Sequence, residues 1–299
     1  MGEKNIERKA VIDLGTNTFN LLVAEFSEGK WRRIHSEKDG VALGMGGINQ
    51  KMITEDAIVR AEKTLTHFKN VSESLGAFEI TAIGTSAIRD AKNQVEFLER
   101  IRRDVGIQIK VISGDEEADL IYQGVRKTIT FDKPSLIMDI GGGSTEFILA
   151  TEEGIQQKVS LDIGVSRILQ LFQFEDPIQP EQVVELENWL EEQSKGFFDQ
   201  LEVTRLIGAS GSFETFYELI HNATISSLDT AIELPFHSFY QELDGLIFST
   251  QAERDVNPWI VPIRKKMAPY AAIKTKWIIN KLGITETYLS PYALKEGAL

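Results

Sequence analysis

Two short stretches decide the fold of this chain: VIDLGTNT at residues 11–18 and MDIGGGST at residues 138–145. In each stretch an apolar run leads to an aspartate, glycine then permits a tight turn, and small hydroxyl residues follow. An apolar stretch resumes after each turn, at residues 19–26 and 147–150. We therefore predict two related strand-turn-strand units, which would grip a phosphate from two sides while their aspartates hold a cation.

The segments outside these two units alternate between strand-like and helix-like patterns, which is typical of an α/β fold. Thr54 is a candidate helix cap, and apolar residues recur after it at spacings of three and four as far as Leu75. Further helices are expected around Val95 to Val105, after Asp115, over 181–201, after the glycine turn 208–212, and over 267–282. Further strands are expected at 31–35, 40–43, 79–83, 107–112, 135–140, 158–163, 206–207 and 285–289.

The length of 299 residues is sufficient for two domains, each with its own core. Residues 128–134 have the composition of a crossover between them. We predict an N-terminal domain over residues 1–126 and a C-terminal domain over 127–299, with the last helix able to pack back on the first domain. Residues 222–258 contain polar and proline-bearing turns and predict no single element.

The composition excludes several kinds of chemistry. The chain has no cysteine, which rules out disulfides, thiolate catalysis and cysteine-bound metals. Its four histidines are scattered, so a metal would be held by oxygen, which favours magnesium or another hard divalent cation. The net charge of −13 argues against nucleic-acid binding. No apolar run is long enough to span a bilayer and no signal peptide is recognised, so we expect a cytoplasmic protein that binds no membrane.

Five segments together resemble one protein family. They are VIDLGTNTFNLLVAE (11–25), AIGTSAIRDAKN (82–93), VISGDEEADLIYQGV (111–125), MDIGGGSTEFIL (138–149) and YALKEGAL (292–299). In this order they resemble the exopolyphosphatase and guanosine pentaphosphate phosphohydrolase (Ppx/GppA) family, in its short two-domain form. The resemblance implies an actin-like ATPase fold, with two ribonuclease H-like domains and a phosphate-binding cleft between them.

The resemblance also suggests roles for individual residues. Glu117 would be the catalytic glutamate that positions water, although from its position alone it could simply complement a helix N-terminus. Glu146 would be a second acid of the cleft, and Asp13 and Asp139 would hold the metal. Arg89 would contact phosphate, its alternative role being a surface ion pair with Asp90 or Glu96. The expected phosphate-binding residues are Gly15, Thr16, Asn17, Thr85, Arg89, Gly142, Gly143, Ser144 and Thr145.

The implied activity is the release of terminal phosphate from inorganic polyphosphate, guanosine pentaphosphate, or both. Asp119 and Ala42 stand where relatives usually carry arginine, and these changes leave the choice of substrate open. Lys265, Lys266, Lys274 and Lys276 are candidates for compensating positive charge. Two alternatives stay open: an ATP-dependent kinase or ATPase of the same superfamily, and a non-catalytic sensor of an alarmone or polyphosphate. The oligomeric state is also open, with a homodimer as one option.

Overall fold

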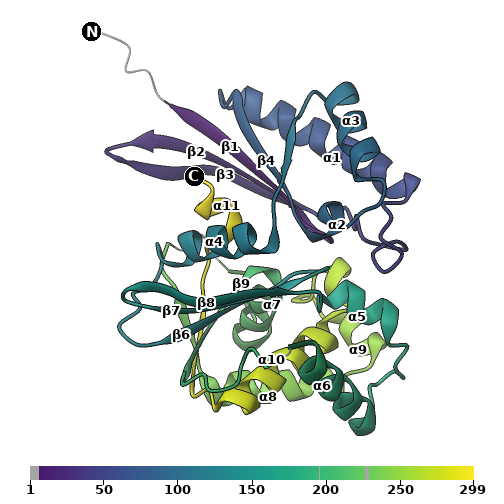
Figure 1. Ribbon diagram of the computed structural model, residues 1–299, viewed down its shortest axis with the longest axis vertical. Helices are drawn as coiled ribbons and strands as arrows, with labels where there is room; N and C mark the ends of the chain where they lie inside the picture. Colours follow the sequence, from purple (N-terminus) through teal and green to yellow (C-terminus); the bar gives the residue numbers. More distant parts are fainter. Residues whose placement is uncertain (1–6, 195, 226–228) are drawn as a thin grey trace.

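The chain folds around two mixed β-sheets, as a computed structural model shows for residues 7–194, 196–225 and 229–299 (Figure 1). The first sheet has five strands in the order β3-β2-β1-β4-β5. β1, β2 and β3 form an antiparallel meander, and β4 and β5 extend the sheet in parallel from β1. The strands are β1 (Arg8–Leu14), β2 (Phe19–Ser27), β3 (Lys30–Asp39), β4 (Glu79–Gly84) and β5 (Ile109–Val111).

The second sheet repeats this arrangement in the order β8-β7-β6-β9-β11, and β10 is added antiparallel at its edge. β6, β7 and β8 form the antiparallel meander, and β9 and β11 continue in parallel. The strands are β6 (Ser135–Ile140), β7 (Thr145–Thr151), β8 (Gly154–Leu161), β9 (Arg205–Ala209), β10 (Ile232–Leu234) and β11 (Glu286–Leu289). The predicted α/β fold of two ribonuclease H-like domains is confirmed.

Helices pack against both sheets. Thr54 caps the first of them, since its hydroxyl accepts a hydrogen bond from the N–H of Ala57, and the apolar face of this helix is buried in the first core. The helices near the first sheet are α1 (Glu55–Ser74), α2 (Ser86–Arg89) and α3 (Gln94–Asp104). Those near the second are α5 (Val165–Leu171), α6 (Pro180–Ser194), α7 (Ser210–His221), α8 (Phe236–Ile247), α9 (Gln251–Val256), the 3₁₀ turn η1 (Pro262–Arg264) and α10 (Ala268–Leu282).

Two helices lie between the sheets: α4 (Gly114–Val125) and the short C-terminal α11 (Leu294–Gly297) (Figure 1). Apolar residues of both helices share one buried cluster with residues of the two sheets, among them Val11 and Ile137. α11 contacts α4, β1 and β2, so the end of the chain returns to the first sheet. The division of the chain at residue 126 stays a prediction.

Three expectations about local structure were wrong. Residues 40–43 form no strand; Ala42 has a left-handed backbone (φ 51°), and the carbonyls of Val41 and Ala42 accept hydrogen bonds from the guanidinium of Arg60. The long helix expected to reach Leu201 ends at Ser194, and Gly196 follows with a positive φ of 77°. β8 spans 154–161 and not 158–163, because it pairs with β7 from Thr151 back to Thr145.

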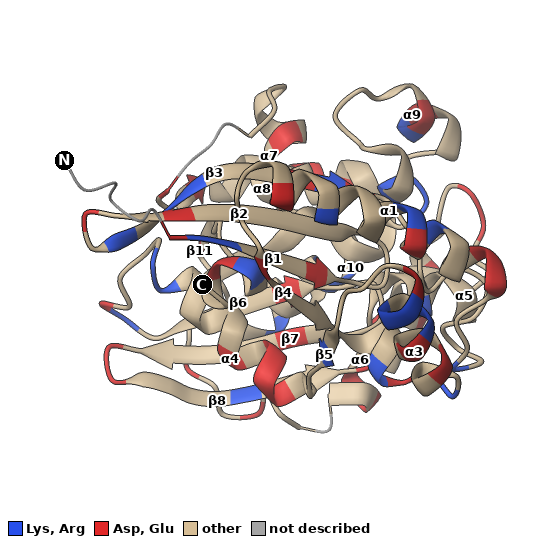
Figure 2. Ribbon diagram, turned by 90° about the horizontal axis from the view of Figure 1, so that it is seen from above, with Lys and Arg blue, Asp and Glu red and all other residues tan. Residues whose placement is uncertain are grey.

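Acidic and basic residues are interspersed along the ribbon, as Figure 2 shows. Asp119, one of the two departures from the family pattern, is half exposed and pairs with Lys158 of β8 at 2.6 Å. The side chain of Asp119 therefore links α4 to the second sheet. No helix in the described part of the chain is long and apolar enough to cross a membrane.

Candidate active site

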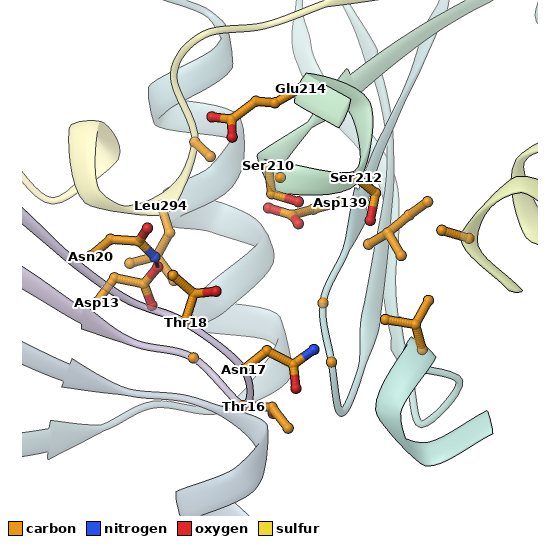
Figure 3. A pocket seen from close by; sticks show the side chains of 18 of the residues that line it. Asp13, Thr16, Asn17, Thr18, Asn20, Asp139, Ser210, Ser212, Glu214 and Leu294 are labelled. Atoms are coloured by element: carbon orange, nitrogen blue, oxygen red, sulfur yellow. Dashed lines mark hydrogen bonds between the residues drawn. The ribbon is translucent and has the colours of Figure 1, made fainter. Parts of the chain in front are cut away.

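A cavity of about 150 Å³ lies between the two sheets, where the turns after β1 and β6 face each other (Figure 3). Both sheets contribute to its lining, together with residues of α4, α7, η1, α10 and α11. The cavity is therefore a shared site, which neither sheet would form alone.

Each hairpin places an acidic side chain in this cavity at an equivalent position. Asp13 is the second-last residue of β1 and faces Asn20 of β2, whose amide donates to Oδ2 of Asp13 at 3.0 Å. Asp139 is the second-last residue of β6 and faces Glu146 of β7, which accepts a hydrogen bond from the hydroxyl of Ser160 at 2.7 Å. The sequence repeat is thus also a structural repeat.

The two turns expose backbone N–H groups. Their carbonyls are taken by neighbouring segments: those of Thr16 and Asn17 accept from Gly44 and Ala42, and those of Gly141 and Gly142 accept from the start of α5. Among the residues that the structure describes, the N–H groups of Thr16, Asn17, Gly142 and Gly143 donate to no protein acceptor. Unused N–H groups on two facing turns are suited to bind an anion such as phosphate.

Glycine is needed in the second turn because the two turns touch. A Cβ atom on Gly142 would lie 2.7 Å from the amide nitrogen of Asn17, and one on Gly143 would lie 2.4 Å from the hydroxyl oxygen of Ser86. Side chains at these positions would push the domains apart. Asn17 also bridges the domains directly, because its Oδ1 accepts from the hydroxyl of Ser166 at 2.6 Å.

The carboxylates of the hairpins hold their protons unusually tightly. Burial raises the pKa of Asp13 to about 7 and that of Asp139 to about 6. Burial and then the charge of Asp139 raise the pKa of Glu146 to about 7. Clustered acids with raised pKa values are typical of sites that bind a cation or transfer protons.

Glu117 enters the same cavity from the first turn of α4. Ser113 caps this helix, and the side chain of Glu116 completes the capping box, so Glu117 is left to face inward. Arg89 donates to Oε2 of Glu117 at 2.8 Å and to the carbonyl of Ile112 at 3.2 Å. Burial, followed by the charge of Glu146, raises the pKa of Glu117 well above its ordinary value, although Arg89 opposes this shift.

The cavity brings together most of the residues predicted from the sequence. Two of them do not line it. Arg89 lies behind Glu117, paired with it, and also 3.9 Å from Asp90. Thr145 is fully buried, and its hydroxyl accepts from the ammonium of Lys274. The predicted residues that do line the cavity are Asp13, Gly15, Thr16, Asn17, Thr85, Glu117, Asp139, Gly142, Gly143, Ser144 and Glu146.

Sequence reasoning missed the basic side of the cavity. Among the described residues, the basic ones in its lining are Lys38, Arg264 and Lys295. Lys295 belongs to the C-terminal motif 292–299 and Arg264 directly precedes a lysine pair, so both had a sequence signal, whereas Lys38 lies in an ordinary exposed strand pattern. The lysines proposed earlier for this purpose, Lys265, Lys266, Lys274 and Lys276, do not line the cavity.

The donor set of the cavity suits a hard cation. The available ligands are carboxylate oxygens, which magnesium prefers, and magnesium commonly takes only one or two protein carboxylates together with waters and substrate phosphates. Within the described ranges, no group of three or more His, Cys, Asp or Glu residues is placed to hold a metal ion by itself. The residues therefore fit an ion shared with a phosphate substrate better than a structural metal.

Comparison with known proteins gives a consistent result. The family model described as "Ppx/GppA phosphatase family" matches residues 22–299. Exopolyphosphatase 1 of Mycobacterium leprae is 26% identical over 299 residues, which is 98% of this chain and 88% of that protein. A bifunctional 3-dehydroquinate synthase/phosphatase of Fusobacterium nucleatum is 33% identical over 71% of this chain, and the match spans 34% of that longer protein.

Solved structures match over nearly the whole chain. A crystal structure of an exopolyphosphatase from Cytophaga hutchinsonii has a TM-score of 0.93 and 33% identity, covering 97% of this chain and 96% of that one. A Ppx/GppA family member from Aquifex aeolicus has a TM-score of 0.82 and 25% identity, covering 98% and 96%. The two-sheet backbone of this chain is therefore similar to that of solved members of the family.

Proposed function

Because this chain belongs to the Ppx/GppA phosphatase family, we propose that it hydrolyses terminal phosphoanhydride bonds. It would release phosphate from inorganic polyphosphate, from guanosine pentaphosphate, or from both. The M. leprae and C. hutchinsonii proteins are named exopolyphosphatases, which favours polyphosphate as the first substrate to test.

The observation that carries this proposal is the pair of facing turns with unused N–H groups. Thr16 and Asn17 on one side, and Gly142 and Gly143 on the other, would donate to the oxygens of the terminal phosphoryl group. Such donors stabilise the charge of a phosphoryl group in the transition state, and they cost no reorganisation when they are already in place. Ser144 and Thr85, both buried in the cavity lining, would add hydroxyl donors.

Glu117 is our candidate for the residue that orients the attacking water. It reaches the cavity beside the turns, and burial and the charge of Glu146 raise its pKa well above the ordinary value, which makes its carboxylate a stronger base. Arg89, which lies behind Glu117, would fix the rotamer of Glu117. Glu146 would take part as a second acid beside the water.

Asp13 and Asp139 are the candidates to hold a divalent cation, magnesium being the best fit to the carboxylate donors. When bound, the cation would neutralise charge on the phosphoryl oxygens. The two aspartates come from opposite hairpins, so either substitution should weaken cation binding by the whole site. Their raised pKa values mean that binding of the cation should release protons.

The experiment that tests this function measures phosphate release from polyphosphate and from guanosine pentaphosphate, with and without magnesium. We expect Glu117→Gln to lower kcat about 100- to 1,000-fold while substrate binding is retained. Glu116→Gln is the matched control, because Glu116 is the neighbouring acid in the same helical turn and is occupied in the capping box. Its kcat should stay close to that of the wild type.

Other outcomes of the same experiment point to the alternatives. If neither substrate is hydrolysed but both bind with Glu117 intact, the chain is a sensor. If ATP is consumed and polyphosphate is not, it is a kinase or ATPase of the same superfamily. Either result would overturn the proposed function.

A further inference from the structure

The cavity lining carries both signs of charge. Its acidic residues are the carboxylates already described, on β1, β6, β7 and α4. Its basic residues are Lys38 of β3, Arg264 of η1 and Lys295 of α11. Lys38 and Arg264 lie together and form the basic end of the cavity, whereas the charge of Lys295 acts on Asp13. If the terminal phosphoryl group occupies the facing turns, the remaining phosphate groups of a longer substrate must find their positive partners among these three residues.

One carboxylate occupies this basic end. Glu214, in the second turn of α7, accepts hydrogen bonds from Lys38 through both its oxygens, at 2.5 and 2.6 Å. Arg264 lies 3.7 Å from the same carboxylate, and its other terminal nitrogen donates to the hydroxyl of Thr215 at 3.1 Å. Figure 3 shows Glu214 on the α7 side of the pocket, beyond Ser210 and Asp139. Glu214 thus lies where an anionic group of the substrate would otherwise bind.

The basic residues are therefore already paired. Lys295 contacts Glu296 at 3.0 Å, and Lys38 and Arg264 share Glu214. Although burial opposes ionisation, Lys38 and Arg264 lower the pKa of Glu214 to about 2, so the carboxylate keeps its charge throughout the physiological range. A phosphate group that enters here must compete with a fixed negative charge.

Backbone geometry holds this arrangement in place. A Cβ atom on Gly211 would lie 1.7 Å from a terminal nitrogen of Arg264, so glycine lets the guanidinium lie against the first turn of α7. The ion pair of Lys38 and Glu214 joins residues 176 positions apart, on β3 of the first sheet and on helix α7. It therefore links the two halves of the molecule at the cavity lining.

We propose that Glu214 is a specificity-determining residue, which competes with the inner phosphate groups of polyphosphate for Lys38 and Arg264 and so disfavours chains of three or more phosphates. The inference rests on the proposed function and concerns the substrate class of the same site. Here specificity comes from a fixed negative charge that repels one class of phosphate ligand, and not from an added contact to the preferred class.

The test compares binding of orthophosphate and inorganic tripolyphosphate by calorimetry, at fixed magnesium, in proteins that also carry Glu117→Gln so that no turnover occurs. Glu214→Gln should bind tripolyphosphate about tenfold more tightly, because two charge-assisted donors become available, while orthophosphate binding changes little. Lys38→Gln should weaken tripolyphosphate binding. Glu62→Gln is the control: Glu62 is also a partly buried glutamate in an ion pair on a helix, but it pairs with Arg100 outside the cavity.

Steady-state kinetics with Glu117 intact provide the second readout. Glu214→Gln should raise kcat/KM for tripolyphosphate and for longer polyphosphate by about tenfold. Failure of Glu214→Gln to tighten tripolyphosphate binding, or an equal effect of Glu62→Gln, would overturn the role of Glu214. Absence of phosphate release from every substrate would instead overturn the proposed function, whatever the binding results.

A pair of variants keeps the test decisive if Glu214→Gln alone does not fold. The double variant Lys38→Gln/Glu214→Gln removes both partners of the closest ion pair and leaves Arg264 without its carboxylate. It should bind tripolyphosphate more tightly than Lys38→Gln alone. Equal binding by these two proteins would show that Glu214 does not compete with the substrate.

Discussion

Lys274 is a fully buried lysine of α10 that lies beneath the second phosphate turn. Its ammonium donates to the hydroxyl of Thr145 and to the carbonyl of Ile163, the latter at 2.5 Å. Burial lowers the pKa of Lys274 from its ordinary value of 10.5 to about 7, although Glu146 and Asp139 oppose the shift. This residue therefore fastens the start of β7 to α10 and makes stability depend on pH.

Lys274→Met should show this dependence. Between pH 7 and 10.5 the unfolded chain holds a proton on Lys274 that the folded chain has released, so the contribution of Lys274 to stability rises with pH. From pH 7.5 to 9.5 we expect the free energy of unfolding of the wild type to rise by about 1.4 kcal/mol per pH unit relative to that of the variant. Urea unfolding would measure this difference. Lys276→Met removes a partly buried lysine of the same helix that pairs with Asp244, and it controls for loss of a lysine. If the difference in free energy of unfolding between the wild type and Lys274→Met did not change with pH, the lowered pKa of Lys274 would be contradicted.

At the scale of elements, the second phosphate turn depends on the start of α5. Gly164 is the N-cap of this helix, and the N–H groups of Val165 and Ser166 bind the carbonyls of Gly141 and Gly142. A Cβ atom on Gly164 would lie 2.2 Å from the carbonyl oxygen of Gly142. Because the contact is with backbone, no side-chain rotation can relieve it.

Gly164→Ala should therefore displace the turn. We expect a loss of about 1–3 kcal/mol in the free energy of unfolding and at least a tenfold fall in phosphate release. The same substitution at Gly245, in the interior of α8, meets open space and should stabilise the protein by about 0.5–1 kcal/mol. Activity equal to that of the wild type in Gly164→Ala would show that the turn tolerates the shift.

Local sequence signals predicted the elements whose pattern is complete within one segment. The hairpins at Asp13 and Asp139, the cap at Thr54 and the start of α4 after Ser113 all follow from such patterns. Residues 40–43 look like a strand, but Arg60 of α1 supplies the hydrogen bonds there. That contact depends on tertiary structure, which propensity does not contain.

At the scale of the whole molecule, the sequence repeat predicted that two turns would face each other, but not which side chains would close the cavity. Lys38 lies on β3 of the first sheet and Glu214 on α7, which packs near the second sheet. They meet only because the two sheets pack around α4 and α11. No spacing in the sequence encodes that distance. The charge of the chain was likewise a poor guide, since a protein of net charge −13 has a basic end to its cavity.

The cavity carboxylates also give the whole protein an unusual stability profile. The pKa values of Asp13, Asp139 and Glu146 are raised to about 7, 6 and 7 in the folded state. Their contribution to stability is therefore fully present below their ordinary pKa values near 4, and it is lost as the pH rises through the folded values. Glu214 acts in the opposite sense, because its pKa is lowered to about 2, but its contribution is lost only below about pH 4.5.

We therefore expect the metal-free protein to lose stability as the pH is raised from 5 to 7.5, at up to about 1.4 kcal/mol per pH unit for each group that titrates. Urea unfolding in EDTA at several pH values would measure the slope of the free energy of unfolding against pH. The double variant Asp13→Asn/Asp139→Asn should have a shallower slope, because asparagine does not titrate. Magnesium should restore stability at pH 7.5 in the wild type and not in this variant, since a ligand of the folded state stabilises it by mass action. If the free energy of unfolding of the wild type stayed constant or rose between pH 5 and 7.5, these carboxylates would already be ionised in the folded protein. That result would contradict their raised pKa values.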